Sequence, residues 1–197
     1  MAAPSGMRIH NFIGHGSIAR RNLDEMEQLF PLRPQESIAT GELTTPSSAE
    51  EFGHRVAEYS GVLFTWESRI RECAAITIVF SAAALEHYIN DFGARQLGDT
   101  YYEQNLEMLS PQQKWIVLPR LARSHQMDRG GRAFELLNTL FRARNELMHT
   151  KSREFSPQRL ERQLENPIIM RARLAVQALD ALRREAQQFD DETAGHF

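Results

Sequence analysis

The sequence predicts an all-α fold, a helical bundle of four main helices that follows an irregular N-terminal arm. Beyond residue 47, apolar residues recur three and four positions apart, which is the period of an α-helix. No proline interrupts the stretch between Pro46 and Pro111. No strand pattern competes, apart from "ESIATGEL" in the arm. With 197 residues, of which 42% are hydrophobic, the chain is long enough for one domain with a real core.

The arm covers residues 1–47, and the remainder, residues 48–197, forms the helical domain. Four of the eight prolines lie in the arm, where they favour irregular structure. Its one helix-like piece runs from Arg20 to Phe30. We therefore expect irregular structure before the bundle begins.

The first part of the helical domain, residues 48–97, has one long apolar face. "SSAEEF" places serines before acidic residues, as at a helix start. Because a helix near 50 residues is far above the usual length, we expect two helices, with a break near Gly61 or Ser68. The second is apolar nearly all round, which predicts a central buried helix that ends near Gly98. The apolar face consists of Phe52, Val56, Tyr59, Leu63, Trp66, Ile70 and Cys73.

Capping signals mark the helices that follow. Ser110 is an expected N-cap, with Pro111 at the first helical position and Gln113 as its capping-box partner. Pro119 is expected to kink or end this helix. The "DRGG" sequence at 128–131 predicts a turn before the next helix, "RAFELLNTLFRARNELMH".

Two further helices are predicted towards the C-terminus. Residues 156–165 form a short one. The last begins with Asn166 as its cap and Pro167 at the first position. Its apolar stripe passes through Leu174, Ala178 and Leu182.

The charge of the chain is unevenly distributed. The net charge is −3, yet residues 112–173 hold 13 basic and six acidic residues, a net of +7. Such a segment attracts polyanions by steering and counterion release even when the whole molecule is acidic. The alternative is that these arginines pair with acidic residues elsewhere in the fold.

Composition also bears on location. No apolar run approaches 18 residues, which argues against a membrane span, and the N-terminal residues lack the order of a signal peptide. The single cysteine, Cys73, cannot form an intrachain disulfide. A cytoplasmic location fits these observations best.

One stretch of polar residues, "RNELMH", closes a helix of core type. It contains Arg144, Asn145 and His149. At roughly 100° per residue, Asn145 and His149 lie about 40° apart on one face, whereas Arg144 lies about 140° from His149. Arg144 therefore converges with His149 only if the helix ends at Met148 or if a partner subunit supplies the second group.

These residue types suit RNA cleavage. The 2′-OH must lose a proton, the leaving 5′ oxygen must gain one, and the phosphate must be stabilised as its charge grows. Histidine is tuned for the proton steps near neutral pH, and arginine binds phosphate with two donors, so no metal or cofactor is required. The alternative is a helix C-terminus stabilised by cations. A loose arginine-to-histidine spacing also occurs at Arg120 and His125, so spacing alone does not decide between them.

"RNELMH" matches the RN-x-x-x-H form of the motif of HEPN domains, which are small helical bundles. The order of several segments adds to this resemblance. "ALEHYIND" looks like the apolar first helix of one bacterial HEPN-like group, and "SPQQKWIVLPRL" and "DRGGRAFELLNTLFRARNELMHTK" resemble its next two helices. "ALDALRREA" resembles the last. The resemblance covers about 68–189.

The resemblance implies a metal-independent endoribonuclease that works as a homodimer, with both motifs facing one cleft. Arg144 would bind phosphate, His149 would be the acid and base, and Asn145 would orient them. Several HEPN proteins belong to toxin–antitoxin or antiphage defence systems, often beside a nucleotidyltransferase-like antitoxin. Others are non-catalytic dimerisation or interaction modules, which is the alternative function for this chain.

Other residues could support such a site. Arg142, Lys151 and Arg153 are expected to bind the RNA backbone. Glu86 and Asn90, one turn apart on the apolar helix, could face the motif from across the bundle; the alternative is a buried hydrogen-bonded pair.

The remaining candidates have weaker functional interpretations. His87 and Asp91 have a metal-ligand spacing but no third ligand, so we expect no metal site. Trp66 and Trp115 are expected in the core rather than as platforms for bases. Tyr101 and Tyr102, after a helix end, are expected to be exposed.

Overall fold

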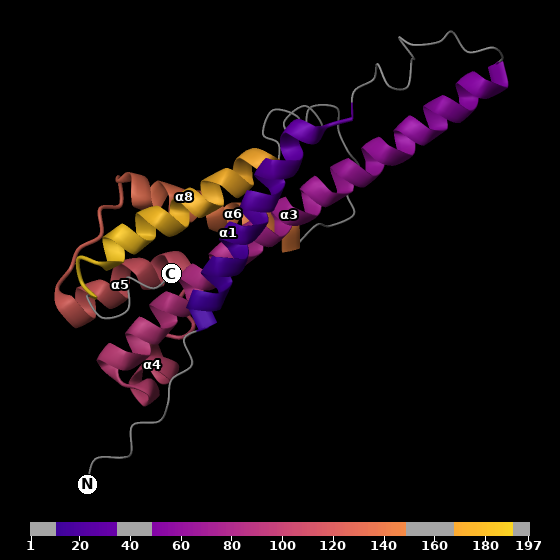
Figure 1. The fold of residues 1–197 in the computed structure, drawn as a ribbon. Helices are drawn as coiled ribbons and strands as arrows, with labels where there is room; N and C mark the ends of the chain where they lie inside the picture. The colour runs from indigo at the N-terminus through magenta and orange to yellow at the C-terminus, as the bar shows by residue number, and fades with distance from the viewer. Residues whose placement is uncertain (1–10, 35–48, 149–167, 191–197) are drawn as a thin grey trace.

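The described part of the chain is all-α. The structure, a computed structural model, describes residues 11–34, 49–148 and 168–190. These residues form six α-helices and one short 3-10 helix, with no strand among them (Figure 1). The elements are α1 (Asn11–Leu29), η1 (Phe30–Leu32), α3 (Ala49–Leu97), α4 (Asp99–Asn105), α5 (Pro111–Arg123), α6 (Arg132–Met148) and α8 (Ile168–Ala186).

The long helix α3 is the axis around which the others pack. It is a single helix of 49 residues, so the expectation of two helices is wrong. The glycine expected at a break, Gly61, costs only about 1 kcal/mol relative to alanine in a helix, and no proline removes a backbone donor. The hydroxyls of Ser60 and Thr65 bond to carbonyls one turn earlier, which keeps these polar residues compatible with the helix. Gly98, with φ of 88°, follows the end of α3 as predicted.

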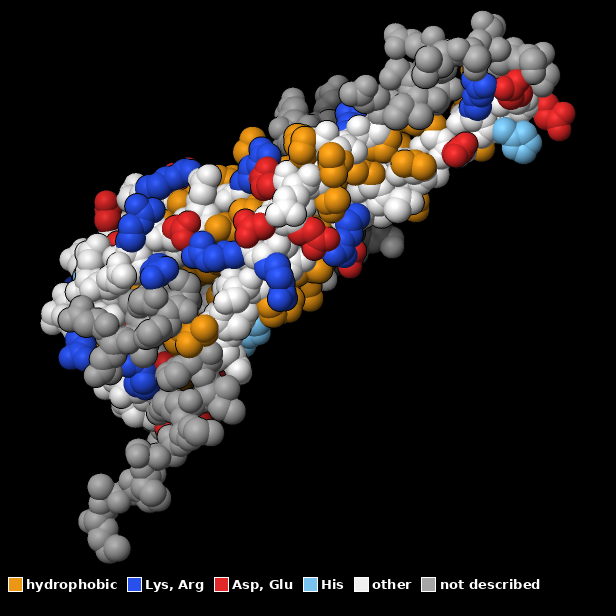
Figure 2. All heavy atoms as spheres, in the orientation of Figure 1, with side chains coloured by type: hydrophobic (Ala, Val, Ile, Leu, Met, Phe, Trp, Pro, Cys, Tyr) orange, Lys and Arg blue, Asp and Glu red, His pale blue; other side chains and the backbone are white. Residues whose placement is uncertain are grey.

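The N-terminal half of α3 extends beyond the rest of the bundle (Figure 1). Several of its large apolar side chains are exposed, and apolar side chains gather along this part of the surface (Figure 2). Phe64, at 72% exposure, is the most open of them, and Phe52 is at 48%. The predicted apolar face is therefore buried only where other helices cover it, from about Ile70 onward.

Helix α1 corrects the expectation of an irregular arm for residues 11–29. It packs antiparallel to α3: the Phe12 ring meets the Tyr88 ring at 5.5 Å, and the Trp66 indole donates to the Leu29 carbonyl at 2.8 Å. The buried positions include Phe12, Ala19 and Met26, seven residues apart. Few and widely spaced apolar residues made this helix hard to predict, and its packing on α3 joins it to the bundle. Residues 1–10 and 35–47 of the predicted arm lie outside the described residues.

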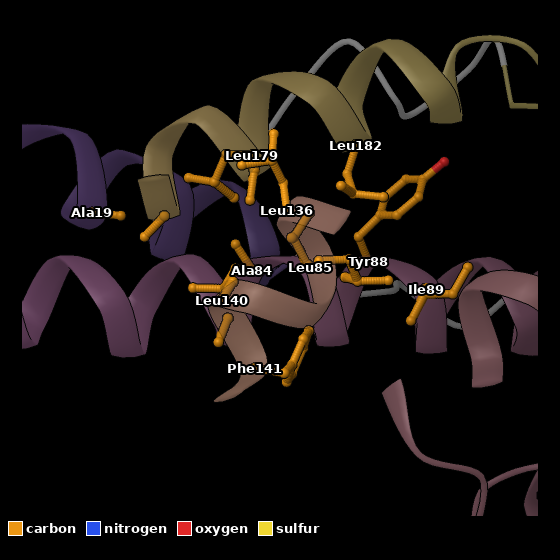
Figure 3. Packing of buried hydrophobic residues seen from close by; sticks show 14 of the residues in the cluster. Ala19, Ala84, Leu85, Tyr88, Ile89, Leu136, Leu140, Phe141, Leu179 and Leu182 are labelled. Atoms are coloured by element: carbon orange, nitrogen blue, oxygen red, sulfur yellow. The ribbon is translucent and has the colours of Figure 1, made fainter. Parts of the chain in front are cut away.

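The core lies where α3, α6 and α8 meet (Figure 3). Its side chains come from successive turns of the three helices, as ridges packed into grooves require. Trp115 of α5 is fully buried in the same cluster, as predicted. The labelled core residues of these three helices include Ala84, Leu85, Tyr88, Ile89, Leu136, Leu140, Phe141, Leu179 and Leu182.

Helix α5 begins as its sequence predicts. Ser110 caps it and forms a capping box with Gln113. Pro119 lies inside the helix without ending it; the end comes at Ser124, which adopts a left-handed conformation with φ of 54°. The predicted "DRGG" turn is also present, with the Asp128 carboxylate accepting the Gly130 N–H at 2.9 Å.

Close packing of α3 against α4 and α5 depends on Gly93. A Cβ at this position would lie 2.8 Å from a Leu118 methyl carbon and 2.9 Å from the Tyr102 ring. At such distances the Leu118 or Tyr102 side chain would have to shift, so a glycine lets the three helices approach here. The Tyr102 ring therefore packs directly against the backbone of α3 at Gly93.

The apolar part of α3 also bears on the membrane question. By length and composition α3 contains a window that could cross a membrane, although 56% of that window is buried inside the bundle. A core helix of a soluble protein passes the same test, so this finding is weak support for a span. Polar residues, most of them uncharged, interrupt its apolar runs, so the sequence shows no continuous apolar run of this length.

Candidate functional site

Arg144, the first residue of the RNELMH stretch, lies near the end of α6 and faces α3. Its Nη2 donates to the Glu86 carboxylate at 3.3 Å, and its guanidinium lies 5.2 Å from the centre of the Phe141 ring. Its Nε is buried and has no hydrogen-bond partner among the described residues. The Arg144 side chain is 27% exposed and that of Glu86 33%. The guanidinium is thus held from one side and open on another.

Of the other two predicted catalytic residues, the structure describes Asn145 but not His149. Asn145 is exposed on α6, beside Arg144. His149, Lys151 and Arg153 lie outside the described residues, so their convergence with Arg144 stays a prediction.

Asn90 lies at the centre of a second set of contacts, one turn after Glu86 on α3. Its Oδ1 accepts a hydrogen bond from the Tyr102 hydroxyl at 2.7 Å and from the Lys114 ammonium at 2.9 Å. We call Glu86, Asn90, Tyr102, Lys114 and Arg144 the Glu86 cluster. Both Glu86 and Asn90 thus make polar contacts across the bundle, but only Glu86 meets the motif.

Two members of the Glu86 cluster were not identified from the sequence. Lys114 is only 4% exposed, and Tyr102, expected at the surface, is 6% exposed, whereas Tyr101 is exposed as predicted. A signal for Lys114 existed: it precedes Trp115 and stands four residues before Leu118, so it lies on the buried face of α5. Tyr102 carried no comparable signal, since its burial depends on the close approach at Gly93.

Burial shifts the titration of these groups. Burial lowers the pKa of Lys114, opposed by the charges of Glu86 and Glu107. Burial raises the pKa of Tyr102 to about 12, with further contributions from Glu107 and Glu86. Tyr102 is therefore a neutral hydrogen-bond donor at physiological pH, and Glu86 is the carboxylate that acts on both Lys114 and Arg144.

The structure bears on the alternative interpretation of the basic segment, in which its arginines pair with acidic residues. Some of its arginines pair with acidic residues: Arg132 with Glu135 at 2.8 Å, and Arg171 with Glu146 at 2.6 Å. Arg142, the described member of the predicted RNA-binding group, is exposed on α6 and has no ion pair with a described residue. The surface near the motif therefore retains basic charge.

Three other histidines, His15, His87 and His125, pack against neighbouring side chains. His125 lies 2.9 Å from the Glu185 carboxylate and packs against Phe189, so its loose spacing from Arg120 has no part in the site. The His87 ring lies 4.8 Å from the His15 ring, while Asp91 binds Arg95 at 2.8 Å.

No group of three potential metal ligands occurs among residues 11–34, 49–148 and 168–190.

Chemically, the Glu86 cluster combines two cations with one carboxylate, an amide and a phenol. Arg144 binds the Glu86 carboxylate, and Lys114 and Tyr102 bind Asn90 one turn away. Cationic and neutral donors gathered in this way suit the binding of an anionic ligand. Comparisons with models of protein families, with curated proteins and with solved structures each found no match.

Proposed function

We propose that this protein is a metal-independent endoribonuclease of HEPN type that acts in a toxin–antitoxin or antiphage defence system. The observation that carries the proposal is the RNELMH stretch at the end of α6, with Arg144 partly exposed beside the Glu86 cluster. Arginine in such a position can bind a phosphodiester, and the histidine five residues later can move protons near neutral pH.

In this proposal the residues divide the work as RNA cleavage requires. Arg144 stabilises the charge that develops on the phosphate. His149 removes the 2′-OH proton or protonates the leaving oxygen, and Asn145 orients the two. Arg142, Lys151 and Arg153 bind the RNA backbone electrostatically.

A homodimer completes the proposal. One histidine does not serve easily as both base and acid in a single step, whereas a two-fold axis brings two into one cleft. Cross-linking that placed the two His149 residues on opposite outer faces would contradict this arrangement. The proposed partners are RNA, a second copy of the chain and a nucleotidyltransferase-like antitoxin, all in the cytoplasm.

A second candidate function is a non-catalytic dimerisation or interaction module of HEPN type. Exposed apolar residues on the projecting half of α3, including Phe52 and Val56, favour it because such residues often mark protein contacts. The ion pair between Arg144 and Glu86 also favours it, since a paired arginine can serve packing alone.

Cleavage of a mixed single-stranded RNA separates the two functions. We expect the purified protein to cut RNA in EDTA and to leave 2′,3′-cyclic phosphate ends. His149→Ala should lower the rate on the order of 10²–10⁴-fold by removing proton transfer. Arg120→Ala is the matched control because Arg120 is exposed on another helix. Wild-type protein that cuts no RNA, or a His149→Ala variant that cuts as fast, would leave the interaction module as the better account.

A further inference from the structure

The ion pair between Arg144 and Glu86 is loosely made. Its single contact is 3.3 Å long, whereas charge-assisted hydrogen bonds are usually about 2.7–2.9 Å. Elsewhere in the protein, Arg173 holds Glu27 through two contacts of 2.6 and 2.9 Å. A long, single and partly exposed contact is one that an incoming anion can replace.

A second cation lies deeper in the same cluster. The Lys114 ammonium carries three donors, and the described residues offer it one hydrogen-bond acceptor, Asn90 Oδ1 at 2.9 Å. Glu86 is one turn from Asn90 on α3, and its charge is the largest acting on Lys114. Because Lys114 binds Asn90 one turn from Glu86, it lies near this carboxylate, and two of its N–H groups are not accepted by any described residue.

We propose that Arg144, Glu86 and Lys114 form an anion-exchange site, in which a phosphodiester takes Arg144 and the displaced Glu86 carboxylate moves to Lys114. The identity of the anion, an RNA phosphodiester, rests on the proposed function. The exchange keeps each charge paired, because Glu86 moves from Arg144 to Lys114 while the phosphodiester pairs with Arg144. The hydrogen bond to Asn90 holds the Lys114 ammonium in place. Without Lys114, the displaced carboxylate would lose its ion pair in a partly buried place, and anion binding would weaken.

The exchange explains why an ammonium is buried here. Burial of a lysine beside a neutral amide is unfavourable, and an apolar side chain of similar volume would fill the same space. A purely structural role for Lys114 predicts that its effect on binding is independent of Glu86. An exchange predicts that the two effects are coupled, so a double-mutant cycle distinguishes the roles.

The experiment measures binding of a 2′-O-methyl RNA oligonucleotide, which lacks the nucleophile for cleavage, by fluorescence anisotropy at fixed salt. Glu86→Gln should tighten binding roughly tenfold by removing the competing carboxylate, and Lys114→Met should weaken it roughly tenfold. The double variant should bind as tightly as Glu86→Gln alone, since no displaced carboxylate then needs a partner. Glu135→Gln is the control for general loss of negative charge, because Glu135 is exposed on the same helix as Arg144.

Melting temperatures verify that each variant is folded, and Lys114→Gln replaces Lys114→Met in the cycle if the latter does not fold. Additive effects of the two substitutions would overturn the exchange site. So would wild-type protein that fails to bind the oligonucleotide, or a Glu86→Gln variant that binds no tighter than wild type or Glu135→Gln. Coupled binding without cleavage of unmodified RNA would support the exchange site while refuting the ribonuclease.

Discussion

Two polar clusters on α3 are built from similar residues and differ in how they are closed. In the first, Arg95 donates to Asp91 and to Asp190, both at 2.8 Å, and the Tyr88 hydroxyl donates to Asp190 at 2.9 Å. We call these four residues the Arg95 cluster. The Asp190 side chain is 3% exposed and that of Arg95 14%.

The Glu86 cluster also contains an arginine, a carboxylate and a tyrosine, but its ion pair is longer and about one third of the Glu86 side chain is exposed. Tight, buried contacts favour a single arrangement, whereas loose, open contacts leave room for a ligand. The comparison suggests that the Arg95 cluster serves the fold and the Glu86 cluster serves a function.

The largest expected effect is on stability. Asp190→Ala removes the buried carboxylate that accepts from both the Tyr88 hydroxyl and the Arg95 guanidinium, so it should lower the free energy of unfolding by about 3–5 kcal/mol. Urea denaturation measures this. Glu135→Ala, which breaks the exposed pair with Arg132, should stay within about 0.5 kcal/mol of wild type. A comparable small loss for Asp190→Ala would remove the contrast between the clusters.

The next effect is on catalysis. Arg144→Ala should slow RNA cleavage roughly 10²–10³-fold, since it removes the group that faces the charge developing on the phosphate. The unfolding free energy should fall by less than in Asp190→Ala, because the pair with Glu86 is loose. Single-turnover cleavage and urea denaturation of one preparation measure both. Arg132→Ala, on the same helix, is the control; slow cleavage there too would argue against a specific role for Arg144.

A smaller effect concerns salt. Replacing Arg142, Lys151 and Arg153 with glutamine should reduce the slope of log binding constant against log salt by about 2, at about 0.7 per contact to single-stranded RNA. Binding at several salt concentrations measures the slope. The control carries the same change at three exposed arginines of other helices, Arg21, Arg71 and Arg184. An unchanged slope in the first triple variant would place the RNA elsewhere.

The smallest effect comes from a histidine outside both clusters. Burial, with a smaller contribution from His87, lowers the pKa of His15 below its usual 6.5. The unfolded chain therefore binds a proton more readily, so stability that is present above pH 6.5 should fall as the pH drops through 6.5 and the lowered pKa. His15→Gln should weaken this dependence in urea denaturation at several pH values. An identical pH profile in the variant would exclude His15 as the titrating group.

Local signals predicted the local features of the fold. Period and capping residues predicted the all-α class, the start of α5 at Ser110 and the end of α3 at Gly98, because these depend on neighbours in the sequence. The predicted length of α3 was wrong. The prediction relied on average helix lengths, and these do not apply to a helix that packs against other helices along only part of its length. Within α1, only the piece from Arg20 onward was expected to be helix-like, because the helix depends on packing against α3 rather than on its own apolar content.

Part of the candidate site was also predictable from the sequence, and part was not. Spacing brought Arg144 and Glu86 into consideration, and their contact across the bundle agrees with one of the two interpretations given to Glu86. Lys114 and Tyr102 come from other helices, so their meeting at Asn90 depends on how α4 and α5 approach α3. The relative placement of helices that are distant in the sequence is difficult to predict from a single sequence.

The continuity of α3 has a mechanical consequence. Phe52 and Glu86 lie on one helix, so the rise of about 1.5 Å per residue separates them by about 50 Å. A helix without a break transmits position along its axis with little loss. A molecule bound at the Phe52 end of α3 would therefore lie at a fixed distance from Glu86.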